Sequence, residues 1–222
     1  MRGIVIVAGG SGSRMGTALP KQYLDLCGEP IMVHTIKKFF DFDPEIEMVL
    51  VLPKSDLDRW EDIKKRFLPH AQIKVTTGGK TRFHSVKNGI QEIKNASLVG
   101  IHDAVRPLVS ARTLEFCYSS AQKHRAAVPV FPMKSSLRTI DGEKSKALDR
   151  STIFAVQTPQ CFTKDLLDSA FEQEYHESFT DDATVIEKYG AEVFCVDGNE
   201  ENIKITTPYD LQIAEVLINS GF

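Results

Sequence analysis

Short apolar runs alternate along this chain with segments in which apolar residues recur every three or four positions. Most of the apolar runs have no polar break, which is typical of strands buried on both faces. Such runs occupy residues 4–7, 48–52, 73–75, 98–101 and 127–130. Helical spacing follows Pro30, the Ser55–Asp58 segment, Arg82 and the Thr207-Pro208 pair. We interpret Ser55 with Asp58 as a capping box and Thr207 as a helix cap.

Alternating strands and helices predict an α/β fold, here a Rossmann-like three-layer sandwich with a mainly parallel mixed sheet. No repeat or linker divides residues 1–222, so we expect one domain. Residues 132–151 break the pattern, because they are polar and contain the Asp141-Gly142 hairpin signal. They predict a protruding β-hairpin arm. An isolated hairpin is marginal in water, so we expect the arm to pack on a second subunit.

Composition narrows the class of protein. The net charge is −3, so the basic excess typical of a nucleic-acid-binding protein is missing. No stretch approaches the roughly 20 apolar residues of a membrane span. The four cysteines are scattered and form no CxxC, which argues against a disulfide scaffold or a zinc clip. We therefore expect a cytoplasmic protein that binds neither nucleic acid nor membrane.

A glycine-rich loop follows the first predicted strand. Residues 8–16 read AGGSGSRMG, and such a loop lies where α/β sheets bind ligands, beyond the carboxyl ends of the strands. Glycines permit close approach, and successive N–H groups form an anion cradle. The spacing is neither the dinucleotide fingerprint nor a Walker A loop. Arg14 and Lys21 add two cations that could surround a triphosphate.

Other loops after predicted strands also carry chemistry. Residues 78–86 place hydroxyl and cationic groups at a helix start, which favours anions. Asp103 ends a strand, a usual place for Mg²⁺ or a ribose hydroxyl to meet the protein. Arg150 and residues 157–160, 180–183 and 202–208 complete the set, and each of these segments also fits a turn, a helix cap or a strand end.

In this order the segments closely resemble the 2-C-methyl-D-erythritol 4-phosphate cytidylyltransferase family of sugar- and polyol-phosphate nucleotidyltransferases. The matching segments are AGGxGxRMG at 8–16, PKQY at 20–23, TRxxSVxNG at 81–89, HDAVRP at 102–107, TPQ at 158–160, DDA at 181–183 and NIKIT at 202–206. The resemblance implies transfer of a cytidylyl group from CTP to a polyol phosphate, methylerythritol 4-phosphate, with Mg²⁺ and with pyrophosphate as the second product.

The resemblance also implies residue roles. The catalytic positions match Arg14 and Lys21, which would stabilise the transition state, and Arg150 and Lys204, which would grip the polyol phosphate. Arg150 would come from the partner's arm in a homodimer. Thr158 and Thr180 would lie near the polyol, and Asp103 near the metal. The nucleotide-binding positions match Ala8, Gly9, Gly10, Gly12, Ser13, Gly79, Arg82, Ser85, Asp103 and Ala104.

The sequence departs from the family pattern at the start of the arm. The family usually has an Asp-Thr pair there, whereas this chain has Phe131-Pro132 before Met133-Lys134. A threonine that helps to hold the polyol phosphate is therefore missing, or is replaced by Ser135 or Ser136.

The sequence disfavours three alternative functions. A ribitol 5-phosphate cytidylyltransferase shares several motifs, but residues 81–86 and 181–183 favour the methylerythritol enzyme. A non-catalytic nucleotide-binding module is disfavoured because all four catalytic cations are present. An NAD-linked oxidoreductase is disfavoured because the dinucleotide fingerprint fails.

Overall fold

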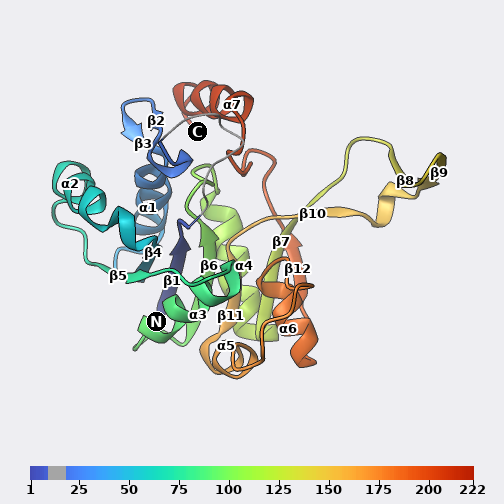
Figure 1. Ribbon diagram of the computed structural model, residues 1–222, viewed down its shortest axis with the longest axis horizontal. Helices are drawn as coiled ribbons and strands as arrows, with labels where there is room; N and C mark the ends of the chain where they lie inside the picture. Colours follow the sequence, from blue (N-terminus) through green and yellow to red (C-terminus); the bar gives the residue numbers. More distant parts are fainter. Residues whose placement is uncertain (10–18) are drawn as a thin grey trace.

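An eight-stranded sheet forms the centre of the computed structural model, which describes residues 1–9 and 19–222 (Figure 1). The sheet has the order β10-β7-β11-β6-β1-β4-β5, and β12 also pairs with β7. These strands are β1 (Arg2–Val7), β4 (Glu47–Leu52), β5 (Ile73–Thr77), β6 (Leu98–Asp103), β7 (Ala126–Pro132), β10 (Phe154–Val156), β11 (Gln160–Thr163) and β12 (Phe194–Asp197).

The strand directions confirm the predicted mainly parallel mixed sheet. β1 pairs in parallel with both β4 and β6, β4 with β5, and β12 with β7. β10 and β11 run antiparallel to their neighbours. All five predicted apolar runs are strands of this sheet.

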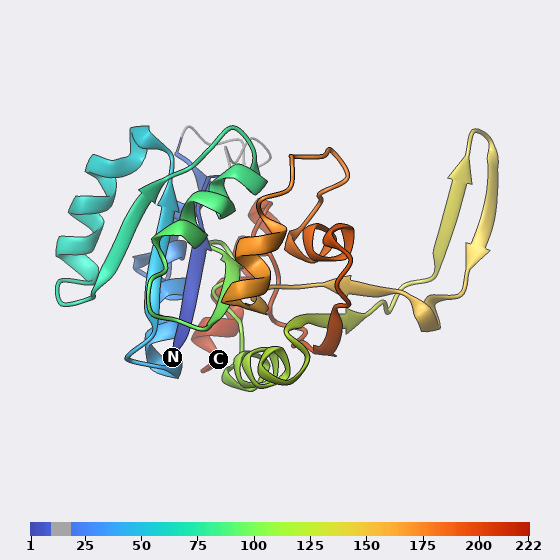
Figure 2. The ribbon, with the colours of Figure 1, turned by 90° about the horizontal axis from the view of Figure 1, so that it is seen from below.

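Helices cover both faces of the sheet (Figure 2). Ile4 and Ile6 of β1 pack in one core cluster with α1 (Ile31–Phe42), α2 (Leu57–Phe67) and α4 (Ala111–His124). Val5 points to the opposite cluster, with α3 (Arg82–Glu92), α5 (Lys164–Ala170) and α6 (Asp182–Tyr189). This alternation follows from the two-residue period of a strand. A smaller cluster joins α7 (Pro208–Asn219) to the start of α1. The predicted three layers are therefore confirmed.

The helix starts show which predicted caps form. The Thr207 side chain accepts a hydrogen bond from the backbone of Asp210, and the two residues form a capping box at the start of α7. The prediction for Ser55 is wrong. A short 3-10 turn, η3 (Lys54–Asp56), precedes α2, so the N-cap position belongs to Asp56. The Ser55 hydroxyl donates to Asp56 and does not cap the helix by accepting from one of its N–H groups.

The predicted arm is a hairpin that protrudes from the body of the fold (Figures 1 and 2). Its strands β8 (Leu137–Asp141) and β9 (Lys144–Leu148) pair antiparallel. Gly142 lies in the turn with φ of 57°, a left-handed value that suits glycine. All residues of β9 are exposed. Short elements complete the described chain, namely η2 (Lys21–Tyr23), β2 (Asp25–Leu26), β3 (Glu29–Pro30) and η4 (Arg150–Thr152).

The direction of the strand order reverses at the carboxyl ends of β1 and β6, which is where open α/β sheets have their ligand crevice. From β1 the chain moves outward through β4 and β5, then crosses to β6 on the other side of β1. Ligands of open α/β sheets bind at such a switch point. Val7 and Asp103 are neighbours there, and the Ala104 N–H donates to the Val7 carbonyl at 3.1 Å. The structure describes no helix long and apolar enough to cross a membrane.

We expect Gly89→Ala to destabilise the fold, because α3 lies close to the sheet at this point. A Cβ atom at residue 89 would lie 2.4 Å from Cγ1 of Val5 and 2.9 Å from Cγ2 of Val51. Overpacking costs about 1–3 kcal/mol, against a gain in helix propensity of about 1 kcal/mol. Urea unfolding should show a net loss of stability. The exposed Gln91→Ala on the same helix is the control and should change stability by less than about 0.5 kcal/mol. Equal stability of the Gly89→Ala variant and the wild type would contradict the packing.

Candidate functional site

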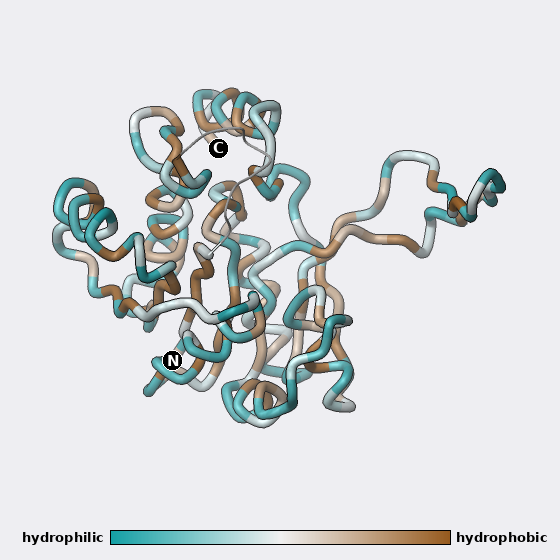
Figure 3. The backbone as a smooth tube through the Cα atoms, in the orientation of Figure 1, coloured by the Kyte–Doolittle hydropathy of each residue, from teal (hydrophilic) through white to brown (hydrophobic). Residues whose placement is uncertain are grey.

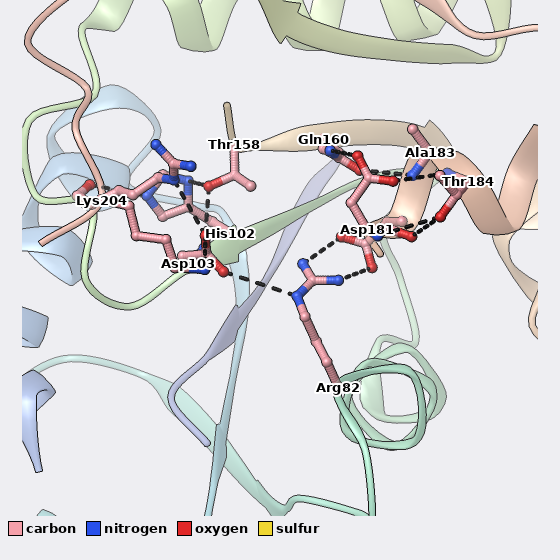
Figure 4. A network of polar contacts seen from close by, with 11 residues as sticks. Arg82, His102, Asp103, Thr158, Gln160, Asp181, Ala183, Thr184 and Lys204 are labelled. Atoms are coloured by element: carbon pink, nitrogen blue, oxygen red, sulfur yellow. Dashed lines mark hydrogen bonds and ion pairs between the residues drawn. The ribbon is translucent and has the colours of Figure 1, made fainter. Parts of the chain in front are cut away.

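Asp103, the last residue of β6, is the centre of a charged cluster at the crevice (Figure 4). Its Oδ2 lies 3.0 Å from Lys204 Nζ and 3.2 Å from Arg106 Nε, and its Oδ1 lies 4.0 Å from Arg82 Nε. Burial would raise the pKa of Asp103, but the three cations outweigh burial and hold that pKa well below its usual range. The cluster thus contains an ionised carboxylate with an excess of positive charge around it.

Arg82 joins this cluster to the start of α6. Its Nη1 and Nη2 donate to the two oxygens of Asp182 at 2.7 and 2.6 Å, a bidentate pair (Figure 4). Asp182 is buried, and burial raises its pKa above the usual range although Arg82 opposes that rise. The predicted nucleotide ligand Arg82 is therefore also the link between α3 and α6.

The segments around Gln160 and Asp181 support the same region. Gln160 Nε2 donates to Asp181 Oδ2 at 2.8 Å, and Gln160 Oε1 accepts from the Ala183 N–H at 2.8 Å (Figure 4). Asp181 Oδ1 in turn accepts from the Thr184 N–H at 2.9 Å and so caps α6. Through these bonds, the predicted motif segments at residues 158–160 and 181–183 join β11 to α6.

A buried chain of hydrogen bonds lies beneath Asp103. The Thr158 hydroxyl accepts from the Asp103 N–H at 3.2 Å and lies 3.0 Å from His102 Nδ1. His102 Nε2 lies 3.1 Å from the Arg106 carbonyl, which can only accept, so the proton belongs on Nε2. Burial lowers the pKa of His102 to about 4, in keeping with a neutral ring. The hydroxyl of Thr158 is thus bonded within the protein, and its contact with the polyol stays a prediction.

The loop before α3 is built around Gly79 and Ser85. The Ser85 hydroxyl accepts from the Gly79 N–H at 3.0 Å and donates to the Thr81 carbonyl at 3.0 Å. A Cβ atom at residue 79 would lie 2.4 Å from His84 Cβ, so the turn requires glycine. These contacts fix the shape of the loop, and nucleotide binding by its residues stays a prediction.

The loop after β1 begins at Ala8 and Gly9, beside Lys21. The Ala8 N–H donates to the Val51 carbonyl at 3.0 Å, and the Ala104 carbonyl accepts from Thr35 Oγ1 at 2.9 Å. Lys21 is buried in η2. Four of the predicted positions lie outside the described residues, namely Gly10, Gly12, Ser13 and Arg14.

Two other predicted site residues, Thr180 and Arg150, lie in the loop before α6 and beside the arm. Thr180 is exposed in the loop just before α6. Arg150 lies in η4 beside the arm, where its guanidinium donates to the Lys134 carbonyl. Within residues 1–9 and 19–222, Arg150 forms neither a hydrogen bond nor an ion pair with Asp103. The structure therefore brings Asp103, Arg82 and Lys204 together in one chain, but not Arg150.

Sequence reasoning assigned no role to two groups that support the cluster. Arg106 contacts Asp103 and donates through Nη1 to the Asn202 carbonyl at 2.8 Å. The buried Asn202 donates through Nδ2 to the Thr158 carbonyl at 2.8 Å. The three-residue spacing from Asp103 to Arg106 could have indicated the first contact, but nothing in the sequence indicates the second.

Comparisons with known proteins agree on one family. A family model described as 2-C-methyl-D-erythritol 4-phosphate cytidylyltransferase matches residues 3–220. A protein with that name from Phocaeicola vulgatus is 46% identical over 217 residues, covering 98% of this chain and 99% of the relative. Another from Bacteroides thetaiotaomicron is 43% identical, covering 97% and 98%. The crystal structure of a 4-diphosphocytidyl-2C-methyl-D-erythritol synthase from Anaerococcus prevotii has a TM-score of 0.82 and 27% identity, covering 98% of both chains.

We expect His102 to make stability depend on pH. An unfolded histidine has a pKa of about 6.5, whereas the folded value is about 4. As the pH falls below 6.5, the unfolded chain binds a proton that the folded protein does not, so stability is lost. Between pH 7 and 5 this loss should be about 2 kcal/mol, and it should be missing from His102→Gln. Urea unfolding at the two pH values measures it.

The exposed His70→Gln is the matched control and should keep the wild-type pH dependence. If His102→Gln keeps that dependence as well, His102 is not held neutral by burial.

Proposed function

This chain belongs to the 2-C-methyl-D-erythritol 4-phosphate cytidylyltransferase family, and we propose that the Asp103 cluster is the site of its reaction. A phosphate oxygen of methylerythritol 4-phosphate attacks the α-phosphorus of CTP. The new P–O bond forms as the bond to the β-phosphate breaks, and pyrophosphate leaves. The matched family does not favour the alternative acceptor, ribitol 5-phosphate.

This reaction requires positive charge in the site, because CTP and methylerythritol 4-phosphate are both anions and repel each other. The attacking phosphate is already anionic, so no general base is needed. Positioning and charge neutralisation supply the catalysis. The observation that carries the proposal is the Lys204–Asp103 contact at the switch point, with Arg82 and Arg106 beside it. Lys204 is exposed, and its flexible stem can carry the ammonium group to a phosphate.

The residue roles form part of the proposal. Arg14 and Lys21 neutralise charge at the reacting phosphorus, and Lys204 with Arg150 binds the methylerythritol phosphate. Thr158 and Thr180 lie near the polyol in the proposed complex. CTP is bound by Ala8, Gly9, Gly10, Gly12, Ser13, Gly79, Arg82, Ser85, Asp103 and Ala104.

Mg²⁺ is also proposed, with Asp103 as its protein ligand. Mg²⁺ in nucleotide sites usually takes one or two carboxylates and completes its coordination with phosphates and water. Asp103 fits, because its carboxylate is ionised and lies at the strand end. Among the described residues no cluster of three metal-ligating side chains occurs. Phosphate oxygens and water would supply the other ligands. When bound, Mg²⁺ neutralises charge on the triphosphate.

A homodimer completes the proposed site. Arg150 lies beside a hairpin that protrudes from its own chain (Figure 1), so we propose that it enters the partner's site. Exposed apolar side chains on the arm, Ile140 and Leu148, favour a packed position in a dimer. The four cysteines are all free, as is usual in a reducing compartment, and we propose that the protein works in the cytoplasm.

We expect pyrophosphate release from CTP and Mg²⁺ when methylerythritol 4-phosphate is added. With ribitol 5-phosphate, kcat/KM should be at least about tenfold lower, because the polar groups of the site are placed to form hydrogen bonds with the hydroxyl groups of methylerythritol 4-phosphate. Lys204→Ala should raise the KM for methylerythritol 4-phosphate more than the KM for CTP. Release with ribitol 5-phosphate alone would contradict the proposed substrate and leave the nucleotide site unchallenged.

We expect two inactive variants to restore activity when their subunits are mixed. Lys21→Ala and Arg150→Ala should each be nearly inactive. In a mixed dimer, one site combines the intact Lys21 of one chain with the intact Arg150 of its partner. Random exchange of subunits should then give about a quarter of the wild-type activity.

The control is each variant unfolded, refolded and assayed alone. If the mixture is no more active than the variants alone, Arg150 does not act across the dimer.

A further inference from the structure

The turn that carries Lys21 is short and depends on its surroundings. η2 consists of three residues, with the Tyr23 N–H donating to the Pro20 carbonyl at 3.0 Å and the Leu24 N–H donating to the Lys21 carbonyl at 3.1 Å. A single 3-10 turn has too few bonds to fix its own position. Lys21, Gln22 and Tyr23 are nevertheless all buried. Their side chains therefore help to hold the turn in its place.

Gln22 ties the turn to the end of β1. Its Nε2 donates to the Ala8 carbonyl at 2.8 Å, and its side chain is buried. Ala8 is itself bonded to the Val51 carbonyl through its N–H. One neighbour of Lys21 is therefore fixed to the strand end from which the predicted nucleotide loop leaves.

Tyr23 ties the turn to the segment after β4. Its hydroxyl donates to Asp56 Oδ2 at 2.9 Å, and both residues are buried. Burial, with Asp56 nearby, raises the pKa of Tyr23, so the phenol remains a donor. The Arg59 guanidinium carbon lies 5.0 Å from the centroid of the Tyr23 ring. Tyr23, two residues after Lys21, is thus fixed to the segment that follows β4, the strand beside β1.

We propose that Tyr23 and Asp56 are positioning residues for Lys21, an inference that rests on the catalytic role proposed for Lys21. In this proposal Asp56 acts indirectly, through its hydrogen bond with Tyr23. The hydrogen bond to Asp56 fixes the position of the Tyr23 phenol. Because Tyr23 and Lys21 belong to the same turn, this bond also orients the Lys21 ammonium group toward the reacting phosphate. A transition state is sensitive to such aim, since a misplacement of about 1 Å can cost on the order of 100-fold in rate.

Three variants separate positioning from packing. Tyr23→Phe keeps the ring and the Arg59 contact but removes the donor, and we expect kcat to fall roughly tenfold with both KM values nearly unchanged. Asp56→Ala should act alike, whereas Asp56→Asn should retain most of the activity because an amide oxygen can accept the bond. Tyr118→Phe is the matched control, since it removes the hydroxyl of another buried tyrosine, which donates to the Gly3 carbonyl at the opposite end of β1 from Ala8. It should lower stability and leave kcat unchanged.

A double variant tests whether the effect passes through Lys21. Adding Tyr23→Phe to Lys21→Ala should cause no further loss of kcat. If the two losses multiply, or if Tyr23→Phe and Tyr118→Phe have the same kcat, the positioning role is overturned.

Labelling of amines gives a readout that does not depend on activity. With acetic anhydride, Lys21 of Tyr23→Phe should be acetylated several times faster than in the wild type, while the exposed Lys188 should react equally in both. Unchanged labelling of Lys21 would overturn the positioning role. An inactive wild type would instead refute the proposed function, and the labelling result would still decide the positioning.

Discussion

A buried carboxylate surrounded by cations organises the crevice of this fold. Asp103 ends β6, and the three cations in contact with it come from separate parts of the chain, at residues 82, 106 and 204. An unpaired charge would be costly at this depth. In the folded chain α3, the loop after β6 and the segment before α7 each bring a cation to the end of β6. The neutralisation of one buried charge thus links three separate parts of the chain.

The same contacts that build the crevice suit the proposed reaction. The cationic side chains that bind the phosphate groups must lie close together, but several cations close together repel one another. Asp103 and Asp182 reduce that repulsion in the ligand-free protein. The bidentate pair between Arg82 and the buried Asp182 is geometrically fixed, whereas the Lys204–Asp103 contact is exposed on the lysine side. In the proposed reaction, Lys204 is therefore the cation that can exchange a carboxylate for a phosphate at low cost.

Local patterns predicted the sheet and the positions of its loops, since buried parallel strands are continuous apolar runs. They failed where contacts are long-range. Nothing near Arg82 indicates that its guanidinium pairs with a residue 100 positions later, or that Asn202 supports Thr158. The Ser55 prediction failed because a 3-10 turn precedes α2, so that Asp56 and not Ser55 occupies the N-cap position. Sequence resemblance could indicate which residues form the site, but the structure shows that several of them also hold the fold together.

In the proposed site, Lys21 lies on a short, buried turn. Catalysis by preorganised charge requires that the charge be in place before the substrate arrives, because reorganisation during the reaction would add to the barrier. A lysine has a long flexible stem, so the position of its ammonium group depends on how firmly the backbone at that residue is held. In this chain that backbone is a three-residue turn, fixed by Gln22 to the end of β1 and by Tyr23 to Asp56 after β4. Because β1 and β4 are paired in the core of the sheet, the rigidity of the core is transmitted to the ammonium group through two side-chain hydrogen bonds.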